Sequence, residues 1–459
     1  MTPLPPDHPE RITLADEAHA RPPEPLETPS RATYVAVLVE PEARPTELTH
    51  LAKLCAAHAV PGPLAGAAHF SATLGALRIK WERHGEFSGY TFFTRGRSPQ
   101  PFSEPPTTLL PPGWLAAIPG VTVAAAHAKL VPAEGLAPPT ASAAAAATAA
   151  SAAPAAAPDA AVLSQHFDGR IVVGAAIGGG AGLAFTDFSI HADGCTRFLV
   201  LDRGLTPRQA GRTLQRLFEI EAYRMLALLA LPIARRQSPR IVAIERALAA
   251  LTDDIAREHV ERRAEDDEAL LQQLTRLAAE VESGLAASQF RFGACRAYFD
   301  LVTRRIAELR ESRLDGLQTI DEFMARRFTP AIATCITVSQ RLHDLSERVS
   351  RASALLSTRV DIARERQSQA LLGSMDRRAR LQLRLQQTVE GLSVAAIVYY
   401  AAGLAGYGAK ALKAAGARID PDLVVGLAIP VVAVLVVLAV RRARRRIARD
   451  DVGAAGHPD

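Results

Sequence analysis

The chain has 459 residues, of which 48% are hydrophobic, so it is long enough for two or three domains that each bury a core. Its formal net charge of +5 does not indicate nucleic-acid binding, because much of the basic excess flanks two apolar segments near the C-terminus, where arginines meet anionic lipid headgroups. The four cysteines are far apart and form no CxxC pair, so the sequence signals neither a zinc site nor a disulfide framework. We therefore expect no cofactor, no bound metal and no nucleic-acid partner.

Residues 1–30 form a proline-rich leader that lacks the charged start and apolar core of a secretory signal. It contains one polar cluster, made of Asp16, Glu17, His19 and Arg21. A histidine beside carboxylates is the raw material of hydrolytic and metal sites. The simpler interpretation, which we prefer, is a solvated or capping segment that docks onto the sheet.

Residues 31–205 are predicted to form an α/β domain with a mixed sheet, within a chain of the α+β class. Runs of β-branched and aromatic residues, typical of strands, alternate with Gly-rich or Asp-Gly turns. The predicted strands are 33–39, 76–83, 86–95, 121–131, 170–177, 183–190 and 196–201, and a helix is expected at 46–59. Residues 138–161 are almost purely Ala, Ser, Thr and Pro, which predicts a disordered insertion.

The segment Thr186 to Gly194, "TDFSIHADG", is a second candidate polar site. If it is a strand, then Asp187, Ser189 and His191 share one face and are able to hold a cation or a polar ligand. More often such a face is merely exposed, with Asp193-Gly194 as its turn. The sequence contains no GxSxG elbow and no HExxH motif, so it shows no recognisable active site.

Residues 206–388 are predicted to be helical, with long antiparallel and coiled-coil helices. Thr206-Pro207-Arg208-Gln209 has the pattern of a capping box. Apolar residues then recur at spacings of three and four in two seams, Ile241, Ile244, Leu248, Leu251 and Ile255, and Leu342, Leu345, Val349, Ala352 and Leu356. Ser283-Gly284 and Pro330 are the expected breaks, after which a third helix runs as a stalk from about Ala331 into the first apolar segment.

Residues 389–441 are predicted to form a hairpin of two transmembrane helices, 391–409 and 423–440, followed by a basic cytoplasmic tail at 442–459. Arginines precede the first span, and Arg441, Arg442, Arg444, Arg445 and Arg446 follow the second. The positive-inside rule therefore places both termini in the cytoplasm of a bacterial inner membrane.

Four small residues of the first predicted span, Gly391, Ala395, Ala402 and Gly406, fall on one helical face. Stripes of this kind allow membrane helices to approach closely. We expect the stripe to pack on the second span or to mediate self-association. A homo-oligomer in the lipid bilayer is predicted, held together by the heptad seams and this small-residue face. Further protein partners are expected but not identified by the sequence.

Four segments, "ADEAHARP", "TDFSIHADG…RFLVLDRGLTPRQAGR", "EIEAYRMLALLALP" and "TVEGLSVAAIVYYAAGLAGYGAK", resemble a bacterial family of uncharacterised membrane-anchored proteins, domain of unknown function family 3422. The resemblance covers nearly the whole chain apart from the leader and the Ala-Pro insertion. It implies a membrane location and no known activity. The architecture is also similar, more loosely, to that of CorA-type magnesium transporters, although Gly406-Tyr407-Gly408 stands where their Gly-Met-Asn signature ends the first span.

Three hypotheses for function follow from these patterns. The preferred one is a non-enzymatic inner-membrane protein whose cytoplasmic α/β head and helical stalk act as a scaffold or sensor. A CorA-like cation channel or transporter is the first alternative. The second is a membrane-tethered enzyme that uses His19 or His191.

Overall fold

The structure is a computed structural model that describes residues 5–12, 14–15, 22–136, 158, 160–257, 264–416 and 420–454. The predicted polar cluster at residues 16–21 and nearly all of the predicted insertion lie outside the described residues. Contacts within the chain define two compact units, here called unit 1 (residues 1–261 and 270–354) and unit 2 (residues 262–269 and 355–459).

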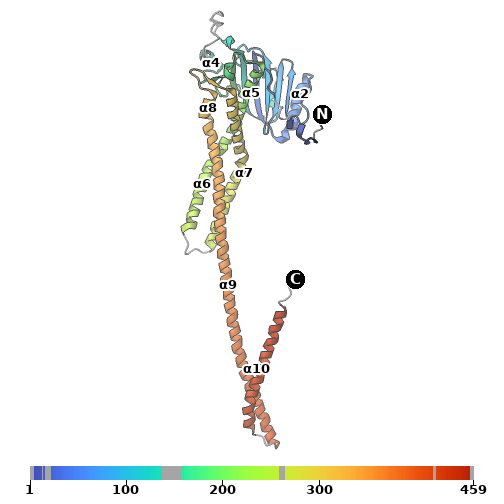
Figure 1. The fold of residues 1–459 in the computed structure, drawn as a ribbon, viewed down its shortest axis with the longest axis vertical. Coiled ribbons are helices and arrows are strands. Elements are labelled where there is room, and N and C mark those ends of the chain that lie inside the picture. Colours follow the sequence, from blue (N-terminus) through green and yellow to red (C-terminus); the bar gives the residue numbers. More distant parts are fainter. Residues whose placement is uncertain are drawn as a thin grey trace. The chain divides into compact units, whose positions relative to one another are not determined.

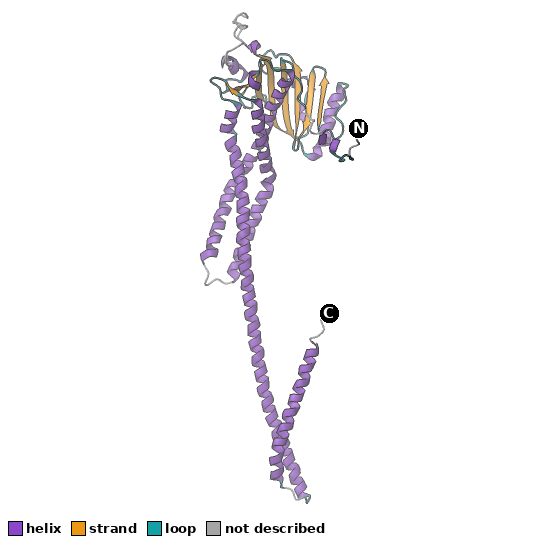
Figure 2. Ribbon diagram, in the orientation of Figure 1, coloured by secondary structure: helices purple, strands orange, loops and turns teal. Residues whose placement is uncertain are grey.

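Within the described residues, the sheet of unit 1 has nine strands in the order β2-β3-β4-β1-β5-β8-β7-β6-β9. Figure 2 draws these strands in orange. Its strands are β1 (Ser30–Leu38), β2 (His69–Leu74), β3 (Leu77–Arg83), β4 (Phe87–Arg95), β5 (Val121–Pro132), β6 (Val173–Ile177), β7 (Gly182–Thr186), β8 (Thr196–Asp202) and β9 (Ser312–Arg313). The pairing of β5 with β8 is parallel, and the other pairings are antiparallel. The predicted mixed sheet is therefore confirmed.

Strand β2 was not predicted, and two further details of the predicted strands are wrong. The strand predicted at 183–190 ends at Thr186, because the Thr186 hydroxyl accepts the Phe188 N–H, and Phe188 has a positive φ of 50° that no strand accommodates. The edge strand β9 comes from the region predicted to be wholly helical. A two-residue strand carries too few residues for a periodic pattern to be seen.

Alternate residues of the strands face opposite layers of helix. One face packs against α2 (Arg44–Ala57), with Trp81, Tyr90 and Leu51 fully buried in a shared cluster. A second cluster on the same face includes Leu199 and receives α4 (Ala160–His166). The other face is covered by α5 (Pro207–Leu228), whose Phe218 stacks on Tyr34 of β1 at 5.2 Å between ring centroids.

The capping box predicted at Thr206 is confirmed. The Thr206 side chain accepts the Gln209 N–H, and the Gln209 side chain accepts the Thr206 N–H, so two free donors at the first turn of α5 are satisfied. Short 3-10 turns complete the head at Pro41–Ala43, Pro106–Leu109, Leu115–Ala117, Ala133–Leu136 and Gly178–Gly180.

Three long helices lie side by side below the sheet in unit 1 (Figure 1): α6 (Ala230–Arg257), α7 (Ala264–Leu309) and the first part of α9 (Thr329–Ala414), with α8 (Ile320–Arg327) before α9. Arg341 of α9 donates two hydrogen bonds to Glu245 of α6, and Ser346 of α9 donates one to Glu282 of α7. Most of the apolar seam residues predicted for these helices are buried, with Ile241 and Val349 both 0% exposed, whereas Ile255 and Ala352 at the ends of the seams are half-buried.

The break predicted at Ser283-Gly284 is wrong, because α7 continues through both residues. An added Cβ at Gly284 would lie 3.6 Å from Gln237 of α6 and 3.6 Å from Leu342 of α9. The glycine thus marks a point where three helices meet rather than a helix end. The predicted start near Pro330 holds, since α9 begins at Thr329 and proline is tolerated in a first helical turn.

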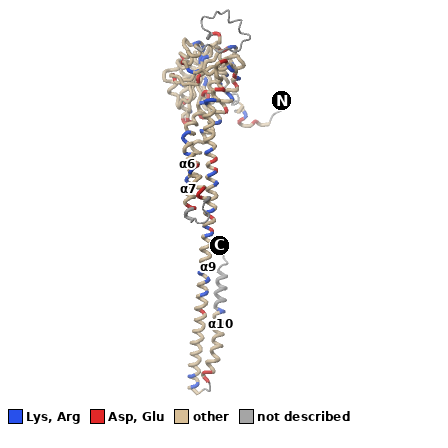
Figure 3. Tube along the Cα trace, turned by 90° about the vertical axis from the view of Figure 1, so that its left-hand side faces the viewer, with Lys and Arg blue, Asp and Glu red and all other residues tan. Residues whose placement is uncertain are grey.

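Unit 2 contains the remainder of α9 and α10 (Pro421–Ala454). Both helices are long and apolar enough to cross a membrane, and the window in α10 has a mean hydropathy of 3.2. Figure 3 shows long uncharged stretches on both helices, and the stretch of α10 begins beside acidic residues and ends at basic ones. Helix α9 runs on to Ala414, so Gly406-Tyr407-Gly408 lies inside the helix rather than at its end.

Candidate functional site

A row of polar side chains crosses the α2 and α4 face of the sheet, between the two apolar clusters. The row, here called the polar strip, consists of Arg31 and Thr33 on β1, His127 and Lys129 on β5, and Arg197 on β8. The strand register aligns them, because Thr33 pairs with His127, and His127 pairs with Arg197. His127 and Lys129 are buried, which is costly for polar groups unless partners satisfy them.

Arg197 connects the polar strip to the loop after α4. Its Nη1 donates to the carbonyl of His166 at 3.1 Å and to Asp168 Oδ2 at 3.0 Å, and its guanidinium lies 5.4 Å from the centre of the Phe102 ring. A hydrogen bond from His191 and the charge of Arg197 lower the pKa of Asp168. Asp168 is therefore held as a carboxylate. Its backbone adopts a positive φ of 52°, which is uncommon for a residue other than glycine.

His191 lies between two carboxylates. Its Nδ1 is 2.9 Å from Asp168 Oδ2, its Nε2 is 2.9 Å from Asp187 Oδ2, and its side chain is 0% exposed. Both ring nitrogens therefore lie within hydrogen-bond distance of a carboxyl group. This arrangement fixes the orientation of the ring and leaves neither nitrogen facing open space, so it does not suit a general base.

The turn that carries these groups also contacts the helices. Phe188, between Asp187 and His191 in sequence, stacks on Phe323 of α8 at 5.0 Å and packs edge-on against Phe198 of β8 at 6.0 Å. Arg224 of α5 lies 5.3 Å from the centre of the same ring. The turn thus joins the sheet, α5 and α8 around one buried aromatic side chain.

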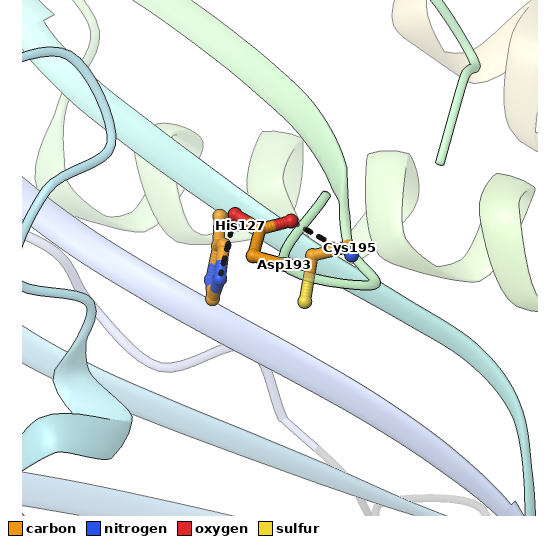
Figure 4. Close-up of side chains that lie close together, drawn as sticks. All are labelled: His127, Asp193 and Cys195. Atoms are coloured by element: carbon orange, nitrogen blue, oxygen red, sulfur yellow. Dashed lines mark hydrogen bonds and ion pairs between the residues drawn. The ribbon is translucent and has the colours of Figure 1, made fainter. Parts of the chain in front are cut away.

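A second cluster at the polar strip consists of His127, Asp193 and Cys195 (Figure 4). One ligand atom from each residue lies within 4.8 Å of the other two, and the cluster is the one group of this kind among the described residues. Asp193 Oδ1 accepts the Cys195 N–H at 3.0 Å, and Asp193 Oδ2 lies 3.8 Å from His127 Nε2. The other ring nitrogen of His127 is 2.9 Å from Thr33 Oγ1.

Burial determines the protonation of this cluster. It lowers the pKa of His127, with a further lowering from Arg197 and an opposing effect of Asp193, so the ring is neutral. Burial, with Asp193, raises the pKa of the Cys195 thiol to about 12. A cysteine nucleophile needs the opposite shift, so this trio does not resemble a cysteine protease site.

Several buried polar atoms around the polar strip have no hydrogen-bond partner within the described part of the chain. They are Arg31 Nε, Ser98 Oγ, His166 Nε2 and Arg197 Nε. Burial lowers the pKa of Lys129, and the nearby charges of Arg97 and Arg31 lower it further. Such a concentration of unsatisfied groups is uncommon in protein interiors and is typical of sites that hold water or a ligand.

The structure brings together two of the residues predicted as a polar site, Asp187 and His191, but not on a strand. They meet because the chain turns after Thr186, and Ser189 instead donates to the Asp187 carbonyl at 3.2 Å. The other predicted residues of this kind, Asp16, Glu17, His19 and Arg21, lie outside the described residues.

The predicted small-residue stripe of α9 has a buried part and an exposed part. Ala402 is buried at 5% exposure, and a Cβ added at Gly406 would lie 2.7 Å from Val425 Cγ2 of α10. Gly391 and Ala395 are exposed. Of the predicted topology arginines, Arg441 and Arg442 are exposed in α10, and Arg444, Arg445 and Arg446 belong to the same helix.

Sequence reasoning missed His127, Cys195, Asp168 and Arg197 as parts of a site. His127 sits in an alanine-rich strand 66 residues before Asp193, and no local spacing joins them. The close spacing of Asp193 and Cys195 was the one available signal, but the Asp-Gly turn explained it equally well.

Comparison with known proteins gives one result. The model of a family described as protein of unknown function (DUF3422) matches residues 6–447 of the chain. No curated protein and no solved structure matches it. The resemblance to CorA-type transporters therefore stays a prediction.

Proposed function

Since the chain belongs to the DUF3422 family of proteins of unknown function, we propose that it is an inner-membrane protein whose cytoplasmic head acts as a sensor or scaffold. In this proposal α9 and α10 form a two-span hairpin, and both termini are cytoplasmic. No catalytic step is assigned to the head.

The exposed apolar surface of unit 2 carries the proposal. None of the apolar window of α10 is buried, and only 11% of the window in α9 is buried. Large side chains such as Leu404 and Leu423 are 77% and 71% exposed. Each such side chain gains about 1.5–3 kcal/mol on leaving water, so two whole helices of them favour a bilayer strongly.

Charge supports the proposed orientation. Arg377, Arg378, Arg380 and Arg384 precede the apolar part of α9, and Arg441 and Arg442 follow that of α10. All of these described arginines are exposed, where they suit a cytoplasmic surface of anionic lipid. At the other ends of these apolar stretches, Lys413 in the last turn of α9 stands against Asp422 in the first turn of α10, so the charge bias there is weaker.

The geometry of the head supports a binding role over a catalytic one. His191 has both nitrogens engaged by carboxylates, and the pKa of the Cys195 thiol is raised rather than lowered. The unpartnered buried atoms of the polar strip favour a site that holds a ligand. Helix α9 contributes residues to both units, so the chain offers a helical connection between a ligand site and a membrane anchor.

Cysteine labelling in intact cells tests the topology. The four native cysteines are buried, so a cysteine at Leu64, which is 81% exposed, or at exposed Lys413 reports its own surroundings. A membrane-impermeant maleimide is expected to label Lys413→Cys from outside, and to label Leu64→Cys only after the membrane is opened. The proposal fails if Leu64→Cys reacts in intact cells, or if the unmodified protein is recovered in the soluble fraction.

A further inference from the structure

We propose that His127, Asp193 and Cys195 form a binding site for a divalent transition-metal ion of the Zn²⁺ type. The site belongs to the head and does not depend on the proposed membrane topology. It gives the head a ligand site, next to the polar strip, that neither the family match nor the sequence patterns assign.

The three ligand atoms are already gathered. Zinc takes nitrogen, oxygen and thiolate ligands at about 2.0–2.3 Å, so ligand atoms in a tetrahedral site lie about 3.3–3.8 Å apart. In the head, the candidate ligand atoms of His127, Asp193 and Cys195 all lie within 4.8 Å of one another. Asp193 sits in an exposed turn, so its side chain has room to move towards the other two ligands.

The surrounding hydrogen bonds orient the ligands as metal sites require. A metal-binding histidine donates its second ring N–H to a protein oxygen, and Thr33 Oγ1 lies 2.9 Å from His127 Nδ1 in that position. The Cys195 N–H holds Asp193 Oδ1, which leaves Oδ2 facing His127 Nε2 at 3.8 Å. In the tautomer with the proton on Nδ1, His127 Nε2 and Asp193 Oδ2 are both acceptors and face each other at 3.8 Å. A cation between them stabilises this arrangement.

The charges of the proposed complex balance. On binding, the Cys195 S–H bond breaks, its proton is released to water, and the thiolate bonds to the metal. One carboxylate and one thiolate then neutralise a divalent ion, while His127 binds as a neutral ligand. A neutral complex suits a site in which His127 and Cys195 are 6% and 8% exposed.

The donor set also restricts the metal. Thiolate and imidazole ligands select Zn²⁺, Co²⁺ and related ions over Mg²⁺ and Ca²⁺, which prefer oxygen ligands alone. Three protein ligands leave a fourth position for water or another ligand. The Asp193 side chain is 38% exposed, so that position has access from solvent.

Co²⁺ binding to the full-length protein in detergent tests the site. After chelation and removal of the chelator, one equivalent of Co²⁺ is expected to produce a thiolate-to-cobalt absorption band in the near ultraviolet and visible bands typical of tetrahedral cobalt. Zn²⁺ is expected to abolish both, and a large excess of Mg²⁺ is expected to leave them unchanged.

Variants identify the ligands. Cys195→Ser is expected to lose the thiolate band, and His127→Gln and Asp193→Asn to weaken Co²⁺ binding at least tenfold. Cys55→Ser, which changes another buried cysteine, is the matched control and is expected to keep the full spectrum. Asp193→Asn separates loss of binding from misfolding. Because the Asp193 side chain is partly exposed, this variant is expected to fold and to give the circular dichroism spectrum of the wild type. The proposal is overturned if Co²⁺ gives no band, if the band survives Cys195→Ser, or if Asp193→Asn folds and binds normally.

Discussion

His191 and its two carboxylates form the most constrained group of side chains in the head. Asp187 is 1% exposed at its side chain, and the His191 side chain is 0% exposed, so neither exchanges its partner for water. Removing His191 leaves the buried Asp187 carboxyl without this hydrogen-bond partner, and an unsatisfied buried polar group costs about 1–3 kcal/mol. His191 thus connects the turn after β7, through Asp187, to the loop after α4, through Asp168.

His191→Ala is therefore expected to destabilise the head by about 1–3 kcal/mol. Thermal unfolding of the full-length protein in detergent, followed by circular dichroism, measures the loss. His58→Ala removes an exposed histidine and is the control, with an expected change within about 0.5 kcal/mol. Equal melting temperatures for the two variants would contradict the buried-pair interpretation.

The pKa of Asp168 adds a pH dependence to the same group. Its folded-state pKa is lowered by the facing groups His191 and Arg197, so the native state binds fewer protons than the unfolded state in acid. The stabilisation is complete above the ordinary aspartate pKa of about 3.9, and it is lost as the pH falls through the lowered folded-state value.

Asp168→Asn removes this titration. We expect the variant to melt below the wild type at pH 7, and the difference between their melting temperatures to shrink as the pH falls towards 3. Because the Asp168 side chain is 57% exposed, the effect will be modest. A difference that stays constant or grows in acid would refute the assignment.

At the scale of elements, the close contact between α9 and α10 depends on a glycine, Gly406, which has no side chain. A Cβ at Gly406 would lie 2.7 Å from Val425 Cγ2, closer than side chains tolerate, while a Cβ at Gly408 would meet nothing within 4 Å. Valine is stiff at χ1, so the clash is relieved mainly by moving the helices apart. The glycine is therefore a packing residue of the proposed hairpin.

Gly406→Ala is expected to lower the melting temperature in detergent, because overpacking costs about 1–3 kcal/mol and outweighs the gain of about 1 kcal/mol in helix propensity. Gly408→Ala gains the same propensity without the clash and should be neutral or stabilising. Val425→Ala is expected to rescue Gly406→Ala in the double variant. If both alanine variants behave alike, the close approach at Gly406 does not exist in solution.

The bundle of unit 1 uses its apolar seams within one chain. Ile244, Leu248, Leu342 and Leu345 are all at most 4% exposed in a single copy. These seams, predicted as coiled-coil surfaces, are thus not free to bind a second copy. A homo-oligomer must use another surface.

At the scale of the whole molecule, the exposed half of the α9 stripe is a surface available for self-association. Gly391 and Ala395 are exposed, and a Cβ at Gly391 would meet nothing within 4 Å. In the predicted homo-oligomer, we therefore expect α9 helices of different copies to pack against each other at Gly391 and Ala395 in the bilayer.

Oxidative cross-linking in membranes tests this pairing. Gly391→Cys is expected to give disulfide-linked dimers, and exposed Ser393→Cys, on the opposite side of the helix, should give few. The four native cysteines are buried and provide a silent background. Equal cross-linking at the two positions, or none at either, would count against this interface.

The sequence by itself determined the features that arise from short-range patterns. Strand runs, the Thr206 capping box, the start of α9 near Pro330 and the two apolar segments all follow from residues close together in the chain. Hydrophobic periodicity reports local structure directly, because side-chain direction repeats with the helix or strand itself. The break wrongly predicted at Ser283-Gly284 shows the limit of such local patterns. Gly284 allows α6 and α9 to pack closely against α7 and does not end its own helix.

Only the tertiary structure decided the candidate site. His127 meets Asp193 and Cys195 because β5 pairs in parallel with β8, with His127 opposite Arg197. His191 meets Asp168 because α4 is followed by a loop that returns to the turn after β7. Such contacts join residues across long loops, and their register is set by packing over the whole sheet, which no spacing along the chain encodes.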